Sequence, residues 1–284
     1  MDLLNEILEN HFLQNAILGA ALIGFANGFF SGFVNLRKDA LAVSALAHTM
    51  LPGIAVAVLI TGSLSQTSAF IGALIACLVV GLGSVVVSRN SRIPHDTALS
   101  VIYTTTFAGG LALLPHLPVA NSLHDWLFGN IIHISQEDLK MVFIISSITL
   151  VLCTLFMRPI LLTLFEPNVA AAQGVPTRTI QYLTFTLLIL MLVASLQAVG
   201  TILSAALLVA PATIMLLFTN RTSLIFWGGA FIGCISGVGG ILLALAMDIQ
   251  AGPAIILLLG ILFLLAFLFS PRYGILFRKT AHSR

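Results

Sequence analysis

One ionisable side chain stands near the middle of a long apolar stretch of the sequence. Residues 40–62 carry no full charge, and His48 lies among them. In an α-helix this imidazole would lie roughly 12–14 Å from the charged end at Arg37, close to the centre of a ~30 Å hydrocarbon core. Ser44 precedes it by one turn and Pro52 follows it by one turn, so the three residues share a helix face. Polar groups at this depth usually face a pathway or a partner helix, and this face is our candidate lining of a translocation path.

The sequence lacks the motifs by which proteins hydrolyse nucleotides. It contains no G-x-x-x-x-G-K-[ST] loop, and its only lysines are Lys38, Lys140 and Lys279. A carrier driven by protons or sodium generally needs ionisable or unwound coordinating groups at mid-depth, and Ser44 with His48 would make a poor proton relay. These absences favour a conduit without enzymatic activity, whose energy comes from a separate subunit.

The composition excludes an ordinary soluble domain. Hydrophobic residues make up 59% of the chain and charged residues 8%, with a mean hydropathy of +1.10. We predict an all-α polytopic membrane protein with one transmembrane domain over residues 1–284. It would have eight or nine spans, at 12–34, 40–62, 66–88, 98–115, 140–162, 179–198, 200–218, 223–247 and 253–270. The spans 98–115 and 200–218 are the weakest, and Pro211 could break the second into a partly re-entrant element.

The basic residues predict the orientation of the chain. With nine spans, Lys140 alone falls on one side of the membrane. The other side holds the remaining eleven of the twelve: Arg37, Lys38, Arg89, Arg92, Arg158, Arg178, Arg221, Arg272, Arg278, Lys279 and Arg284. Because basic loops stay in the cytoplasm, we predict an external N-terminus and a cytoplasmic C-terminus.

Glycines and prolines mark further elements. Two predicted spans carry a glycine at every fourth position, at Gly24, Gly28 and Gly32 and at Gly229, Gly233 and Gly237. Such stripes let helices approach closely, and we expect tight seams within the subunit or between subunits. On the cytoplasmic side, residues 166–175 predict a short helix that begins with a proline and ends with a glycine.

Several stretches, taken together, resemble one known family. Leu46 to Gly53, LAHTMLPG, resembles the second-helix motif of the ZnuB-like permeases, the zinc/manganese/iron family of ATP-binding-cassette importers, which reads approximately G-D-A-L-S-H-A-x-L-P-G. Five more stretches agree in the same order along the chain: PHDTA at 94–98; WLFG at 126–129 with I-S-x-x-D-L at 134–139; E-P-x-x-A-x-x-x-G-V at 166–175; residues 199–213; and D-x-x-x-G-P at 248–253. The architecture would be related to that of the vitamin-B12 and siderophore importers.

The resemblance implies a permease subunit in a bacterial inner membrane. It would pair with a second copy or a paralogue, bind cytoplasmic ATPase subunits and receive divalent zinc, manganese or iron from a periplasmic or surface metal-binding protein. It would hold no permanent cofactor and no nucleic acid, and it would work by alternating access. By the same likeness, residues 211–223 would couple it to the ATPases through Pro211, Thr213, Asn220 and Arg221, with residues 166–175 as a second surface. Alternatively, both segments are plain connections between helices.

One position departs from the family motif. The family has an acidic residue four positions before the histidine, where this chain has Ser44, and a hydroxyl is a weak ligand for a divalent transition ion. Three explanations remain open for this difference. A partner permease could supply the full acidic–histidine pair, or His48 could act alone as a transient ligand. Alternatively, the substrate has changed or activity is lost. His48 could also be a structural histidine hydrogen-bonded between helices. The wider alternatives are a metal-chelate importer of the same architecture, a degenerate heterodimer partner, a secondary carrier and a membrane scaffold.

Overall fold

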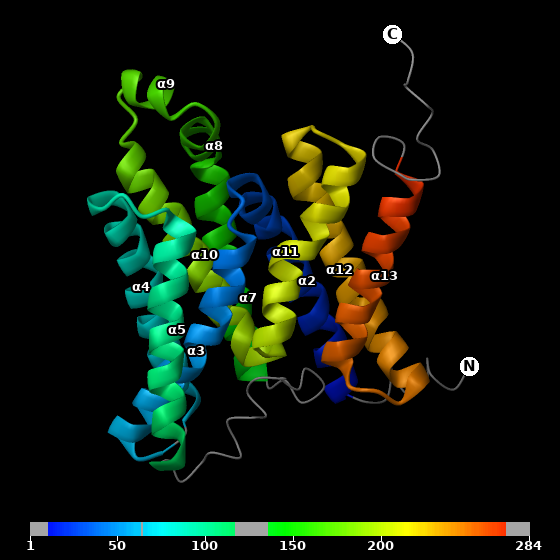
Figure 1. Ribbon diagram of the computed structural model, residues 1–284. Helices are drawn as coiled ribbons and strands as arrows, with labels where there is room; N and C mark the ends of the chain where they lie inside the picture. Colours follow the sequence, from blue (N-terminus) through cyan, green and yellow to red (C-terminus); the bar gives the residue numbers. More distant parts are fainter. Residues whose placement is uncertain (1–10, 64, 117–135, 271–284) are drawn as a thin grey trace.

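The computed structural model describes residues 11–63, 65–116 and 136–270, and within these residues the chain is helical with no strand (Figure 1). Long helices alternate in direction along the bundle. They are α2 (His11–Arg37), α3 (Ala40–Thr61), α4 (Gln66–Asn90), α5 (His95–Leu113), α7 (Gln136–Leu155), α10 (Thr177–Val199), α11 (Thr201–Phe218), α12 (Thr222–Met247) and α13 (Ala251–Phe269). Shorter elements are η1 (Leu114–His116), α8 (Met157–Phe165) and α9 (Pro167–Ala172).

The predicted all-α membrane fold is confirmed. Eight of the described helices are long and apolar enough to cross a membrane. The exception among the long helices is α5, which corresponds to the weak span 98–115 and carries Asp96 and several hydroxyl side chains. Because α5 runs beside α3 and α4 along the bundle (Figure 1), it belongs to the same layer despite its polarity.

The predicted span 140–162 is divided in the structure. Helix α7 ends at Leu155, and α8 begins at Met157 after Phe156 leaves the helical run. Pro159 explains the break, because it has no N–H for the carbonyl of Leu155 and its ring crowds that carbonyl. The apolar run is therefore one span followed by a short helix at the end of the bundle.

The proline in the predicted span 200–218 has a different outcome, because α11 runs through Pro211 without a break. The neighbouring α2 satisfies backbone groups on both sides of the proline. The Ser31 hydroxyl accepts the Ala212 N–H at 2.9 Å, and the Asn35 amide donates to the Val209 carbonyl at 2.9 Å. A neighbouring helix thus adds hydrogen bonds to backbone groups beside the proline, a support that membrane helices containing proline commonly receive.

The glycine stripes form one seam inside the subunit. Gly28 of α2 packs on Gly229 of α12, and Gly24 packs on Gly233 one turn away, with their backbones in contact. Beside the seam lies a cluster of aromatic rings, in which Phe33 and Phe226 have centroids 4.5 Å apart. The prediction of a tight seam is confirmed, and the seam lies within the subunit.

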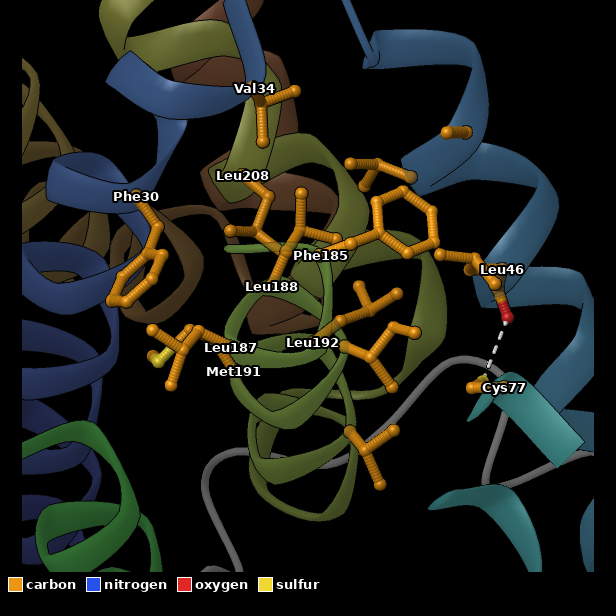
Figure 2. Packing of buried hydrophobic residues seen from close by; sticks show 14 of the residues in the cluster. Phe30, Val34, Leu46, Cys77, Phe185, Leu187, Leu188, Met191, Leu192 and Leu208 are labelled. Carbon is orange, nitrogen blue, oxygen red and sulfur yellow. Dashed lines mark hydrogen bonds between the residues drawn. The ribbon is translucent and has the colours of Figure 1, made fainter. Parts of the chain in front are cut away.

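The largest buried cluster is centred on α10. Phe185, Leu188 and Leu192 lie between α2, α3 and α11 with apolar side chains on several sides (Figure 2). At its edge the thiol of Cys77 in α4 lies 3.4 Å from the carbonyl oxygen of Leu46 in α3 (Figure 2). Helix α10 is followed immediately by α11, because Gly200 adopts a φ of +79° that a side chain would disfavour.

Both predicted cytoplasmic segments lie at one end of the bundle, the upper end in Figure 1. The short helix predicted within 166–175 is confirmed as α9, with Pro167 at its first position and Gly174 at a φ of +79° beyond its end. The α2–α3 turn, the end of α4 and the α11–α12 turn lie at the same end, so the basic residues of these turns gather there. That this end faces the cytoplasm stays a prediction from the positive-inside rule.

Candidate functional site

The first half of α3 is exposed along one side and buried elsewhere. Leu41, Ser44 and His48 are exposed along one side, whereas most other side chains of the helix are buried. The spacing of three and four residues places them on one stripe, as the sequence predicted for Ser44 and His48. In a single chain, therefore, Ser44 and His48 point away from the protein core, whereas the hydroxyl of Thr49 is buried and donates to the Ala45 carbonyl.

Close contacts hold the second half of α3, which begins near Pro52, against its neighbours. Gly53 packs on Gly72 of α4, backbone to backbone, and Gly110 of α5 packs directly on the ring of Pro52. Helix α3 continues through Pro52 to Thr61. The small residues therefore fix where α4 and α5 lie relative to the exposed stripe.

The imidazole of His48 lies against α5. Its ring centroid is 5.8 Å from that of Phe107, with the planes tilted by 59°. Among the described residues the imidazole makes this ring contact and no hydrogen bond. A structural histidine, as interpreted from the sequence, would need a hydrogen bond to a neighbouring helix. Nearby on α5, Ser100 and Thr104 are exposed at four-residue spacing. The two helices together present imidazole and hydroxyl groups at their exposed surfaces.

The described part of one chain does not complete a metal site. No group of three or more His, Cys, Asp or Glu side chains is clustered within the part of the chain that the structure describes. The exposed stripe offers one imidazole from His48 and one hydroxyl from Ser44. A divalent ion on this face would need further ligands from water or from a second chain.

The four predicted coupling residues occupy two different places. Pro211 is buried inside α11, and the Thr213 hydroxyl lies 2.8 Å from Asn35 Oδ1 of α2. Asn220 and Arg221 lie instead in the exposed turn between α11 and α12. The first two residues anchor α11 inside the bundle, and only the turn offers a surface.

Sequence reasoning missed the polar residues of α2 that hold α11. Asn27, Ser31 and Asn35 follow one another at four-residue spacing beside the glycine stripe. Asn27 contacts Ser195 of α10 at 3.0 Å, while Ser31 and Asn35 bond to α11. Their spacing is the signal that could have found them, because polar residues that recur every fourth position in an apolar helix usually face a partner.

Comparison with known proteins assigns the chain to a family. Residues 9–270 match the ABC 3 transport family. The chain belongs to this family. It is thus a multi-pass membrane permease of the ATP-binding-cassette type, in the bacterial plasma membrane, as its sequence predicted.

Several members of the ABC 3 transport family are similar over nearly their full length. The manganese transport system membrane protein MntC of Halalkalibacterium halodurans is 37% identical, over 96% of this chain and 92% of the relative. The manganese import system permease protein ScaB of Streptococcus parasanguinis is 31% identical over 99% and 98%. A Haemophilus influenzae protein, whose name assigns it to an iron transport system, is 32% identical over 98% and 97%.

Two solved structures share the fold. PsaBC from Streptococcus pneumoniae, solved in complex with a Fab, superposes with a TM-score of 0.83 at 30% identity and covers 96% of both chains. An inward-facing structure of a metal-chelate type ABC transporter superposes with a TM-score of 0.71 at 17% identity, over 94% of this chain and 88% of that one. The second likeness concerns the fold alone.

Proposed function

We propose that this chain is the membrane-spanning subunit of a manganese importer driven by separate ATPase subunits. The observation that carries the proposal is the exposed, mid-depth His48 of α3, inside the stretch that resembles the family's histidine motif. Support for manganese comes from the names of the relatives MntC and ScaB. The chain supplies a route, and it carries no nucleotide-binding motif of its own.

The route would follow the polar face of α3 and α5. A second permease chain would cover this face, so that each subunit adds an imidazole and hydroxyl groups around the same path. Manganese accepts oxygen ligands and tolerates imidazole, and it would keep several waters in such a neutral ligand set. Weak, transient coordination suits an ion that must leave the site during each cycle.

Uptake of radioactive manganese tests the path directly. Cells would express the chain with its ATPase and binding protein, and carry His48→Ala. We expect uptake to fall to background, because the one imidazole of the exposed stripe is lost. Leu41→Ala on the same stripe is the matched control, since Leu41 is 71% exposed and offers no ligand. Unchanged uptake in His48→Ala, with normal membrane insertion, would refute the ligand role; competition by zinc and iron would identify the preferred metal.

Two exposed segments at the basic end are the proposed docking surface for the ATPases. They are α9 with its flanking residues, and the turn at Asn220 and Arg221. Val169 on α9 is an aliphatic side chain that is 42% exposed, although it lies outside the spans. Phe165, which ends α8 four residues before Val169, is 55% exposed, and exposed apolar side chains that lie together mark a protein contact.

Co-purification of the ATPase tests this surface. Val169→Asp should sharply reduce the ATPase recovered with the permease, because it places a charge in an apolar contact. The control is Ile249→Asp at the opposite end, where the side chain is exposed to a similar degree, 37%. Equal recovery from the two variants would contradict docking at α9.

A further inference from the structure

A basic groove lies where the end of α4 meets the beginning of α10. Its volume is about 610 Å³, and its polar lining comes from Arg89 and Asn90 of α4 and from Arg178 and Tyr182 of α10, among others. No acidic residue lines it. The groove is separate from the polar face of α3 and α5, so the proposed metal path leaves its arginines without a role.

One arginine of the groove is held in place by α10. Arg89 donates a hydrogen bond to Gln181 Oε1, and its guanidinium carbon lies 5.2 Å from the centroid of the Tyr182 ring. Arg178 stands three and four residues before these two contacts, so it lies on the same face of α10. Both guanidinium groups are exposed and line the same groove. Oriented planar cations of this kind suit the oxygen atoms of a phosphate group.

An apolar column leads from the groove along α4. Val86 lines the groove, and Ile71, Ile75 and Val79 are exposed along the same side of the helix. Gly83 interrupts the column, and a side chain there would meet open space. From residue 71 to residue 86 the helix rises about 22 Å, more than the ~15 Å of hydrocarbon in one leaflet. Charge at one end and exposed apolar surface below it match the two parts of a lipid.

We propose that this groove binds an anionic phospholipid, with its phosphate between Arg89 and Arg178 and an acyl chain along the apolar column of α4. Basic pockets between membrane helices bind such head groups. A soluble acidic protein would satisfy the arginines but leave the column uncovered. A zwitterionic lipid would bring a cation to a groove that already holds two. The proposal depends on the membrane location of the chain and holds whichever metal the importer carries.

Native mass spectrometry of the full chain in detergent, titrated with phosphatidylglycerol or phosphatidylcholine, tests the site. We expect the native chain to retain phosphatidylglycerol preferentially. Each lost charge should weaken this binding about fivefold, so Arg89→Gln with Arg178→Gln should weaken it by more than tenfold. The matched control is Lys38→Gln with Arg158→Gln, which removes two basic side chains from the same end but outside the groove. The control should bind like the native chain.

Three outcomes would overturn the proposal. The first is equal phosphatidylglycerol binding by the groove variant and the control variant. The second is displacement of the lipid by excess inorganic phosphate, which would show a site for a free anion. The third is unchanged lipid binding with loss of ATPase co-purification, which would assign the arginines to a protein contact. If the double variant does not purify, Arg178→Gln alone carries the test with its fivefold effect, because Arg89 then keeps its contacts with α10.

Discussion

Helices meet on glycine at two places in this molecule, and the surroundings of the two contacts differ. Along the α2–α12 seam, Gly28 and Gly229 touch beneath a buried cluster of phenylalanine rings. Around α3, Gly53 makes an equally close contact with Gly72 of α4, and Gly110 of α5 packs directly on Pro52. There, however, a groove of about 910 Å³ opens beside the contact and is lined mostly by aliphatic side chains.

The two contacts have different roles in our interpretation. We call the α2–α12 seam the frame, and the exposed side of α3 and α5 around His48 the working face. In lipid, helices are held by close packing of small residues and by polar contacts, since apolar surface gains nothing by leaving the hydrocarbon. The seam is bordered by packed phenylalanine rings and cannot shift without breaking many contacts. The α3–α5 contact borders this groove, whose α4 side is the apolar column of Ile71, Ile75 and Val79, and His48 lies on the exposed side of α3. We expect the seam to decide stability and the α3–α5 contact to decide transport.

The largest effect should come from a methyl group in the seam. In Gly28→Ala the new Cβ would overlap the carbonyl oxygen of Gly229, and neither backbone can move away inside the buried seam. Overpacking costs about 1–3 kcal/mol and more where nothing yields, so we expect a loss above about 3 kcal/mol and little purified protein. The measurement is a thermal melt of the detergent-solubilised chain.

The matched control for the seam is Gly83→Ala in α4. Its Cβ meets no atom within 4 Å, and alanine favours a helix over glycine by about 1 kcal/mol. This variant should melt at or above the native temperature. A similar melting temperature for Gly28→Ala and Gly83→Ala would show that the seam is not the rigid part of the fold.

Adding a methyl group at Gly110 should destabilise the protein less than Gly28→Ala does. It should nevertheless reduce manganese uptake. The new Cβ would lie 2.6 Å from Cβ of Pro52, so α5 must move away from α3. It has room to move, because a Cβ at the adjacent Gly109 meets nothing within 4 Å. We expect Gly110→Ala to lose about 1 kcal/mol and several-fold in manganese uptake.

Gly109→Ala is the control for this position, since it adds the same methyl group to the outer side of α5. It should leave both melting temperature and uptake near native values. If the two variants transport manganese equally well, the spacing of α3 and α5 does not set the path, and the proposed working face is wrong.

Much of the frame could be predicted from sequence because its signals are periodic. The four-residue glycine spacing predicted the seam, and the proline and glycine at the two ends of 166–175 predicted α9. Proline within a span was less informative. Pro159 ends α7 whereas Pro211 is accommodated in α11, and the difference depends on Ser31 and Asn35 of α2. Partners some 180 residues away in sequence are not visible in a local pattern.

The working face could be predicted only in part. The positions of His48 and Ser44 on one helix face followed from their spacing, and the structure places both on the exposed side. The ring contact of His48 with Phe107 could not be predicted from the sequence. The exposed position of the α5 hydroxyl groups could not be predicted either. Both depend on how α5 packs against Pro52. The ligands that would complete a metal site are also not found together among the described residues.

The smallest effect is expected where a charge is added to the working face without changing its packing. Ser44→Asp would place a carboxylate one helical turn from His48 on the exposed stripe. If two copies of this face surround the path, the added carboxylates should increase the manganese retained by the purified complex and slow its release, since carboxylate oxygen is a preferred ligand of this ion. The measurement is metal content by mass spectrometry, with Leu41→Asp, two turns from His48, as the control.

Equal retention in the native chain and in Ser44→Asp would place the ion elsewhere. A rise in both variants would show that added charge alone attracts manganese, whereas a rise in Ser44→Asp alone would locate the ion between Ser44 and His48.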